Sequence, residues 1–293
     1  WVLAGADRYR EQGFDIIVAV GGSSPMDCAK GIGIVSSNSR RVLEFEGIDE
    51  VPVPGPPLVC IPTTAGTAAE VSQFAIINDT ARLVKIGIIS KAVVPDVALV
   101  DPETTHTMGS HLTACTGLDV LVHAVEAYVS TAHSPITDLH ALEAIGLVAC
   151  HLPIAVRKPE DGEARHGMML ASLHAGLAFS NASLGAVHAM AHSLGGLLDL
   201  PHGETNALLL EGVVAFNYRE APERYEAVTQ ALSPGAGAGA HALCAAIGEL
   251  RAQAGIGHRL ADIGLRSDRI PQLAERALHD LSLIHISEPT RPY

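Results

Sequence analysis

Two pairs of residues spaced four apart are the part of this sequence best suited to hold a metal ion. Asp119 and His123 form one pair and His188 and His192 the other, so each pair lies on one face of an expected helix. His202, within Pro-His-Gly, adds an imidazole from an expected loop. One carboxylate and three imidazoles suit Fe(II) or Zn(II) and leave a position for a substrate oxygen. That set is Asp119, His123, His188 and His202.

A hydrogen-bonded interior histidine is the better explanation for any one of these side chains taken alone. Both pairs and the Pro-His-Gly segment together favour a metal site, because a carboxylate in an apolar run is costly to bury without a cation or another partner. Ten other histidines show no such grouping and are expected to be structural or to face solvent: His106, His111, His133, His140, His151, His166, His174, His241, His258 and His279.

A strand, a glycine turn and a helix near the start of the chain indicate a phosphate-binding segment. Phe14–Val20 is a short β-branched apolar run, typical of a buried parallel strand. Gly21 and Gly22 allow close approach of the backbone to a ligand. Ser24 is the expected N-cap of the following helix, and Asp27 completes a capping-box-like pattern. Free N–H groups at this helix end suit a pyrophosphate, although a turn without a ligand explains the segment alone equally well.

A second unit carries three threonines around one glycine. Thr63, Thr64 and Thr67 offer donors to phosphate or to ribose hydroxyls. Two apolar runs follow, at residues 73–78 and 83–89, and the polar turn between them predicts a hairpin. Lys85 lies in the second run, where a buried lysine would need an anionic partner or a route to solvent.

The sequence changes character near residue 108, from alternating strands and helices to helices alone. The predicted fold class is therefore α/β + all-α, with an α/β domain at 1–108 and an all-helical domain at 109–280. Apolar residues at a period of 3.6 predict the helices of the second domain, at 113–130, 136–152, 162–180, 187–198, 206–216, 221–232 and 240–254.

Both ends of the chain suggest a fragment. The chain begins at Trp1 and enters a helix-like stretch, Val2–Gln12, at once, so the front of the first domain is expected to be missing. Residues 281–293 resemble the translation of a sequencing adapter, and a frayed native tail is the alternative. His285 lies within that segment and is therefore not a candidate site residue.

The composition argues against nucleic-acid-binding, membrane-binding and disulfide-rich classes of protein for this chain. Lys and Arg total 19 against 32 Asp and Glu, a formal net charge of -13, and no basic cluster offsets it. A nucleic-acid or anionic-membrane partner is therefore not expected, and no uninterrupted apolar run approaches the roughly 20 residues of a membrane span. Five cysteines without a CxxC fit a reducing, cytoplasmic setting, and neither a disulfide scaffold nor a structural zinc site is expected.

Four motifs, within about residues 13–220, closely resemble the iron-containing (group III) alcohol dehydrogenase family: GGSSPMDCAKG, PTTAGTAAEVS, TGLDVLVHAVEAY and GAVHAMAHSLGGLLDLPHG. The segments CAKGIGIVSSN, EVPVPGPPL and LHAGLAFSNASLG are most similar to the branch described as alcohol-dehydrogenase-like regulatory proteins of bacteria. The resemblance implies a dinucleotide-binding α/β domain, a helical metal domain and a site in the cleft between them.

The resemblance also implies roles for individual residues. Asp119, His123, His188 and His202 would bind the metal, His192 would lie beside the nicotinamide and substrate, and Phe179 near the substrate. The cofactor would contact Gly21, Gly22, Ser23, Ser24, Asp27, Thr63, Thr64, Thr67, Ser72 and Lys85. Ser23 stands where the family usually has a third glycine, and its Cβ would crowd the pyrophosphate if the turn required a positive φ there.

The expected function is metal-dependent hydride transfer between a small primary alcohol or its aldehyde and NAD or NADP, by a chain that is expected to form a homo-oligomer, a dimer. The segment that would distinguish NAD from NADP is expected to precede Trp1. The alternatives are a regulatory or sensory protein that keeps the fold and metal site, and a non-redox relative such as a sugar-phosphate cyclase. The short Thr-Thr-Ala-Gly-Thr loop and the missing basic cluster argue against the cyclase.

Overall fold

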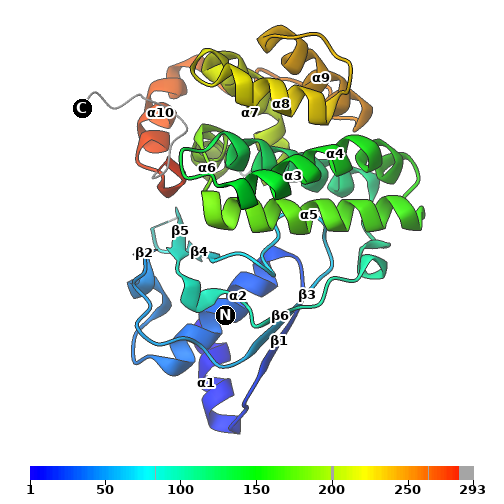
Figure 1. Cartoon of the computed structure of the whole chain (residues 1–293). Helices are drawn as coiled ribbons and strands as arrows, with labels where there is room; N and C mark the ends of the chain where they lie inside the picture. Colours follow the sequence, from blue (N-terminus) through cyan, green and yellow to red (C-terminus); the bar gives the residue numbers. More distant parts are fainter. Residues whose placement is uncertain (83, 199–200, 263, 284–293) are drawn as a thin grey trace.

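The computed structural model describes residues 1–82, 84–198, 201–262 and 264–283, and it consists of an α/β part and a helical part (Figure 1). The α/β part contains α1 (Val2–Gln12) and α2 (Ser23–Ser37), which pack on each other. The order of elements confirms the predicted α/β + all-α class.

Two small sheets form the α/β part. In the first, β3 (Leu58–Pro62) lies between β1 (Ile17–Gly21) and β6 (Val97–Ala98), and all the strands are parallel. In the second, β5 (Val84–Ile89) lies between β2 (Gly47–Ile48) and β4 (Phe74–Asp79). β4 and β5 are antiparallel, which confirms the predicted hairpin.

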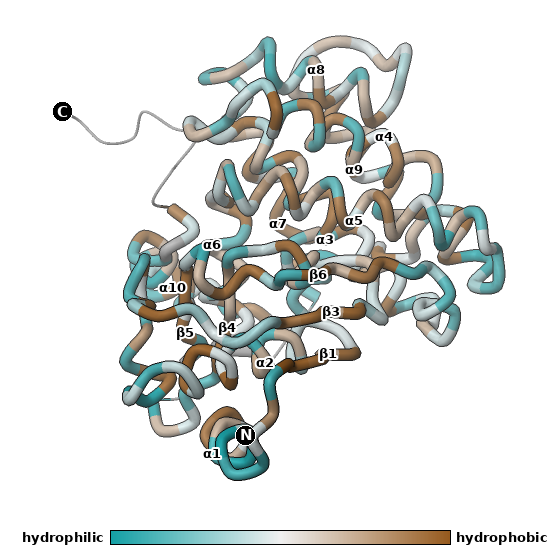
Figure 2. Tube along the Cα trace, turned by 60° about the horizontal axis from the view of Figure 1, so that its bottom comes forward, coloured by the Kyte–Doolittle hydropathy of each residue, from teal (hydrophilic) through white to brown (hydrophobic). Residues whose placement is uncertain are grey.

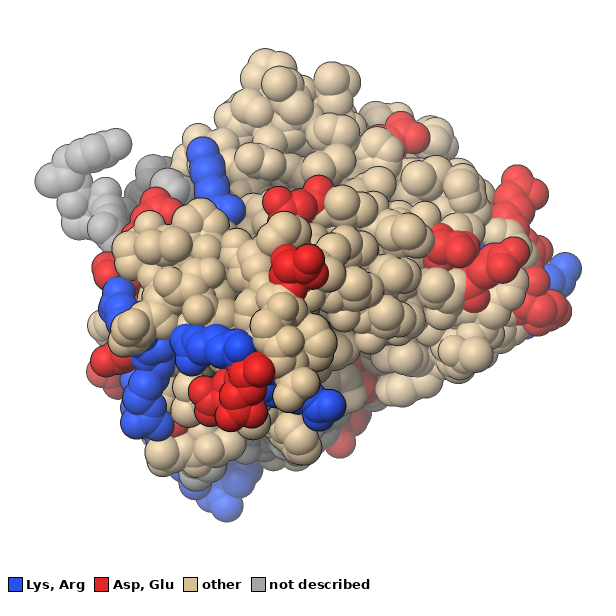
Figure 3. All heavy atoms as spheres, turned by 90° about the horizontal axis from the view of Figure 1, so that it is seen from below, with Lys and Arg blue, Asp and Glu red and all other residues tan. Residues whose placement is uncertain are grey.

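The prediction that the first strand is buried is wrong for one of its faces. Ala19 lies in a core cluster with Met26 of α2, whereas Val18 and Val20 are 56% and 59% exposed. Side chains alternate between the two faces of a strand, so only one set contacts α2. Figure 2 shows β1 and β3 as apolar segments. On the face shown in Figure 3, basic and acidic side chains lie next to one another.

The helical part is built around α3, which lies among the other long helices (Figure 1). Its helices are α3 (Ser110–Val129), α4 (Pro135–Arg157), α5 (Gly162–Ala182), α6 (Ala186–Leu198), α7 (His202–Asn217), α8 (Pro222–Leu232), α9 (Ala240–Gln253) and α10 (Ile270–Leu278). Short 3-10 segments lie at Val42–Phe45, Lys91–Val93, Pro102–Thr105, Tyr218–Glu220, Ser267–Arg269 and Leu281–Leu283. Of the tail predicted to be non-native, residues 284–293 lie outside the described residues.

Several helix boundaries differ from the prediction, among them the end of α4 and the starts of α7 and α2. α4 continues through the buried Pro153, because packing against α3 and α5 outweighs the roughly 3 kcal/mol that an interior proline costs. α7 begins at His202, so this histidine lies on a helix and not in a loop. α2 begins at Ser23 with Gly22 as its N-cap, and no side chain caps it, so Ser24 is not the cap.

Two helices, α3 and α4, are long and apolar enough to cross a membrane by length and composition alone. The apolar window of α3 is 89% buried within the protein and that of α4 is 44% buried. Core helices of water-exposed domains have the same length and composition, and α3 lies in the main core cluster.

The loop after β3 joins the two parts of the molecule because small residues let it lie against α3 and α5. A Cβ added at Gly66 would lie 2.8 Å from the Cβ of Thr116 on α3. A Cβ at Gly176 on α5 would overlap Ala68 and would lie 2.8 Å from Val71 Cγ2. The loop that carries the predicted threonines is therefore held directly on the helical part.

Replacing Gly176 with alanine is expected to destabilise the protein by about 1–3 kcal/mol, because the added methyl overpacks this junction. Gly212→Ala on α7 is the matched control, since a Cβ there meets nothing within 4 Å. It is expected to stabilise the helix by about 0.5–1 kcal/mol. Urea unfolding of both variants measures the difference, and equal effects of the same sign would contradict the close packing.

Candidate metal and cofactor site

The core helix α3 places a carboxylate and an imidazole together inside the helical part. Asp119 and His123 are 2% and 4% exposed, and His123 Nδ1 lies 3.9 Å from Asp119 Oδ2. The neighbouring positions of α3 are apolar and buried, so this carboxylate cannot be solvated by water in the ordinary way. Its charge has to be balanced by the groups that face it.

Two further histidines reach the same carboxylate from other helices. His188 on α6 and His202 on α7 place their Nε2 atoms 3.7 and 3.9 Å from Asp119 Oδ1. One potential ligand atom each from Asp119, His188 and His202 lie within 4.8 Å of one another. The His123 and His188 rings are stacked with their centroids 4.5 Å apart. The structure thus brings Asp119, His188 and His202 into one group of possible ligand atoms, and His123 lies beside it, against Asp119 and His188.

The protonation states of this cluster suit a divalent cation. Burial alone would raise the pKa of Asp119, but the facing histidines and an amide lower it to about 2. Burial lowers the pKa of both His123 and His188 to about 4. Near neutral pH the cluster therefore carries one negative charge and neutral imidazoles with lone pairs to donate. Among the described residues, His123 Nδ1 is buried without a hydrogen-bond partner, and a bound ion would satisfy it.

Asn206, which the sequence analysis missed, fills the space between the ligand atoms. Its Nδ2 donates to Asp119 Oδ1 at 2.6 Å and lies 3.1 Å from His188 Nε2 and 3.2 Å from His202 Nε2. Its own Oδ1 is buried and has no hydrogen-bond partner in the described part of the chain. An amide N–H group thus makes contacts that a cation would make more strongly, which again fits a metal at this point.

Glu126 is the second residue that the sequence analysis missed. Its Oε2 accepts from His188 Nδ1 at 2.6 Å and from the Gly185 N–H at 3.0 Å, and its Oε1 accepts from the Val187 N–H at 2.6 Å. Burial raises the pKa of Glu126 to about 7, and these backbone donors oppose the rise. Because Nδ1 of His188 donates to this carboxylate, Nε2 is left with its lone pair toward Asp119.

His192 and Phe179, which the resemblance places near the nicotinamide and the substrate, contact the histidines of this cluster. The His192 ring stacks on that of His202 at a centroid distance of 5.2 Å, and its Nδ1 lies 3.1 Å from Asp280 Oδ2. The Phe179 ring stacks on His123 at 4.4 Å. One side of the cluster is therefore apolar, and the other carries a half-buried imidazole held by a carboxylate.

The glycine turn and the threonine loop meet at the carboxyl ends of parallel strands, where α/β folds bind ligands. The Thr63 N–H donates to Gly21 O at 2.9 Å, and a Cβ at Gly22 would lie 3.3 Å from Thr64 Oγ1. Gly21 has φ +150°, whereas Ser23 has no positive φ and opens α2. The turn therefore does not need the third glycine of the family pattern.

The remaining predicted cofactor residues lie at varied depths. Ser24 and Lys85 are exposed, and Thr67 is half-buried. Ser72 is buried, and its Oγ accepts from Lys30 Nζ at 3.2 Å. Lys85 on β5 lies opposite Asn78 in the hairpin. Lys85 thus has the route to solvent that a lysine in an apolar run requires.

Asp27 is a buried carboxyl beside this turn, and we expect it to make stability depend on pH. Burial raises the pKa of Asp27 to about 6, although Lys30 opposes the rise. A pKa above the unfolded value means that its stabilisation is complete below about pH 4 and is lost as the pH rises to about 6. The stability of wild type relative to Asp27→Asn should therefore fall over that window. Denaturant unfolding at several pH values measures it, and a constant difference would contradict the burial.

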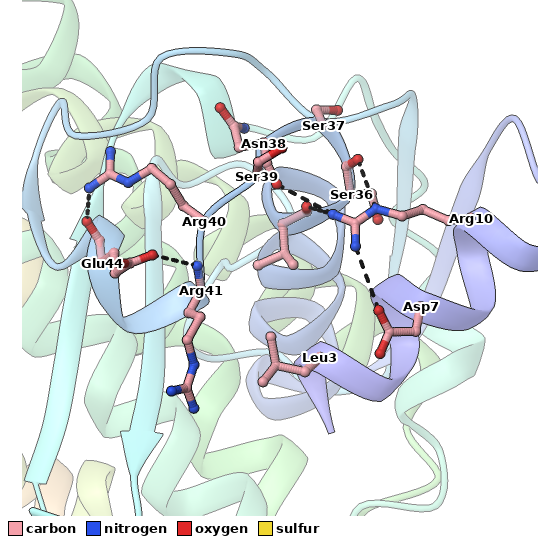
Figure 4. Close-up of a pocket in the computed structure, with 11 residues that line it drawn as sticks. Leu3, Asp7, Arg10, Ser36, Ser37, Asn38, Ser39, Arg40, Arg41 and Glu44 are labelled. Atoms are coloured by element: carbon pink, nitrogen blue, oxygen red, sulfur yellow. Dashed lines mark hydrogen bonds and ion pairs between the residues drawn. The ribbon is translucent and has the colours of Figure 1, made fainter.

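A hollow of about 620 Å³ elsewhere in the α/β part is structural (Figure 4). It lies between α1 and the end of α2, and Arg10 points into it. Arg10 Nε donates to Ser36 O at 3.3 Å, and its guanidinium also bonds Val35 O and Asn38 O. The arginine therefore caps the last carbonyls of α2, which accounts for its charge without a ligand.

Family models match both parts of the chain. A family model described as "Iron-containing alcohol dehydrogenase" matches residues 2–102, and one described as "Fe-containing alcohol dehydrogenase family, C-terminal" matches residues 113–291. The 1,3-propanediol dehydrogenase of Citrobacter freundii is 42% identical over 284 residues, which cover 95% of this chain and 73% of that protein.

Two further relatives are a curated enzyme and a solved structure. The NAD-dependent methanol dehydrogenase of Bacillus methanolicus is 38% identical over 285 residues, or 96% of this chain and 75% of the relative. The crystal structure of a 1,3-propanediol oxidoreductase superposes with a TM-score of 0.95 at 41% identity, covering 99% of this chain and 77% of the other.

Proposed function

Because this chain belongs to the iron-containing alcohol dehydrogenase family, we propose that Asp119, His123, His188 and His202 bind its catalytic metal ion. The chain is an alcohol dehydrogenase and not only a regulatory protein, since its relatives at about 40% identity over most of its length are dehydrogenases. The observation that carries the metal proposal is the buried Nδ1 of His123, which faces Asp119 and has no hydrogen-bond partner among the residues that the structure describes.

The proposed cofactors are Fe(II), with Zn(II) as the alternative, and NAD, the cofactor in the printed name of the methanol dehydrogenase relative. The substrate is an alcohol or its aldehyde, and we propose a small primary alcohol because Phe179 closes one side of the site. The proposed division into domains falls at residue 108.

The cysteines are free, which supports a reducing, cytoplasmic setting. The exposed side chains of Ile136 and Leu139 on α4 support a contact between two copies of the chain in a dimer.

When bound, the metal ion supplies a Lewis acid for the alcohol oxygen and the nicotinamide supplies the hydride acceptor. The residues of this chain then have three tasks. Phe179 excludes water beside His123, and the glycine turn with Thr63 and Thr64 holds the phosphates. His192 takes the hydroxyl proton, because Asp280 holds its Nδ1 and leaves Nε2 to exchange it.

Steady-state reduction of NAD and NADP by short primary alcohols, with added Fe(II) under anaerobic conditions, tests the proposal. We expect turnover by the chain and none by His202→Ala, which loses a ligand on the rim of the site. Turnover no higher than that of His202→Ala, while metal is bound, would contradict the dehydrogenase mechanism.

Replacing His192 with glutamine is expected to lower kcat about 100-fold or more, the usual contribution of a positioned proton-transfer group. Bound metal should stay unchanged, because His192 is not among the proposed ligands. Metal analysis and kcat on the same preparation measure both. His133→Gln is the control, because His133 is an exposed histidine that likewise pairs with a carboxylate, that of Asp138, and this variant should keep full activity.

A further inference from the structure

A second group of metal-binding side chains lies at the start of α3 and α7. His111 Nε2 lies 3.7 Å from Cys115 Sγ and 3.7 Å from Glu204 Oε2. One ligand atom from each of these residues lies within 4.8 Å of the others. The expectation that His111 belongs to no group is therefore wrong, because Glu204 reaches it from a helix that lies far away in the sequence.

The packing of α7 on α3 brings these side chains together. A Cβ at Gly203 would overlap the carbonyl oxygen of Cys115, so only glycine lets the first turn of α7 lie this close. His111, Cys115 and Asp119 recur every four residues on one face of α3, about 6 Å apart along the helix axis. The second group is therefore the next step along that face from the proposed catalytic site.

The separations and donor types fit a tetrahedral zinc-like ion. Bonds of about 2.0–2.3 Å from nitrogen, oxygen and sulfur to zinc put neighbouring ligand atoms roughly 3.3–3.6 Å apart. The observed separations of 3.7 Å are close to this value. A sulfur ligand favours zinc or a similar borderline ion over magnesium or calcium.

Glu204 lies between two histidines. His258 Nε2 lies 2.7 Å from Glu204 Oε1, on the other carboxylate oxygen from the one that faces His111. Glu204 is mostly buried, with 13% of its side chain exposed, whereas 67% of the His111 side chain is exposed. The group thus has a mostly buried carboxylate and an open side for entry of an ion.

We propose that His111, Cys115 and Glu204 form a second metal site for Zn(II) or a similar borderline divalent ion, with solvent completing the coordination and His258 beside the carboxylate. The site is separate from the proposed catalytic ligands and joins the first turns of α3 and α7. A bound ion would link the helix that carries Asp119 to the helix that begins with His202.

Titration of the metal-free full chain with Co(II), in a buffer with a thiol-free reductant, tests the proposal. Sulfur-to-cobalt charge transfer absorbs in the near ultraviolet, and the proposed catalytic set contains no sulfur. We expect this band in the wild type and in His202→Ala, and its loss in Cys115→Ser. Persistence of the band in His202→Ala would separate this site from the catalytic one even if the catalytic proposal failed.

Two further variants test whether loss of the band comes from loss of the proposed ligands and not from unfolding or from another cysteine. His111→Ala changes an exposed side chain, and it should weaken Co(II) binding at the sulfur site at least 10-fold without unfolding the protein. Cys150→Ser removes an exposed cysteine on α4 and should leave the band unchanged. No band in the wild type, or loss of the band in Cys150→Ser but not in Cys115→Ser, would overturn the proposal.

Discussion

Replacing Asp119 with asparagine is expected to remove the bound catalytic metal and to lower kcat/KM on the order of 1,000-fold or more. The metal supplies several kcal/mol of transition-state stabilisation, and each 1.4 kcal/mol is a factor of ten in rate. Asp119 is the anionic member of the proposed ligand set, and its carboxylate faces His123, His188 and His202. An amide carries no charge to attract the cation, so the remaining imidazoles would bind it weakly.

Metal content and kcat/KM, measured on the same preparation, check this prediction. Asp7→Asn is the matched control, because that carboxylate is 68% exposed at the far end of the α/β part and should leave both quantities unchanged. Circular dichroism should show that Asp119→Asn keeps its helices, because Asn206 can still bond an amide oxygen at this position. Wild-type metal affinity in Asp119→Asn would contradict the ligand assignment.

The helical part was largely predictable because apolar periodicity is a local property of the chain. α5 and α9 begin where the pattern predicts. Errors arose where packing between distant segments overrules local preference. Pro153 stays inside α4 because α3 and α5 pack against this helix, and the local sequence does not predict that packing.

The predicted ligands came from spacings of four within single helices, which a sequence displays directly. Glu126 was missed although it follows His123 by three positions in a run of buried residues, a signal that was present. Asn206 lies four residues after His202, and Cys115 lies four residues after His111, but the predicted helices began only at residues 206 and 113. The other partners, Asp119 for Asn206 and Glu204 for His111, lie on a different helix, and only the packing of α7 on α3 brings them within reach.

Ser23, in place of the family's third glycine, shows that a family pattern can mark a departure whose effect depends on the backbone conformation. The resemblance marks Ser23 as a departure, and sterics predict a conflict only if φ is positive there. The structure places the positive φ at Gly21 instead, two residues earlier. Ser23 is half-buried at the start of α2, where its N–H and hydroxyl are compatible with a phosphate.

Replacing Glu126 with glutamine is expected to lower metal affinity about 10–100-fold, the usual effect of removing a carboxylate behind a metal-binding histidine. A glutamine keeps one acceptor oxygen, so its amide group must face at least one of the donors from Gly185, Val187 and His188. A buried donor left unpaired costs about 1–3 kcal/mol, so the melting temperature should fall as well.

The dependence on metal concentration distinguishes this positioning role from a ligand role. All the proposed ligand atoms remain in Glu126→Gln, so saturating metal should restore most of kcat, whereas it should not do so in Asp119→Asn. Glu163→Gln, at an exposed position in the first turn of α5, is the control and should bind metal as the wild type does. Unchanged metal affinity in Glu126→Gln would mean that the 2.6 Å contact with His188 does not hold the imidazole in its metal-binding orientation.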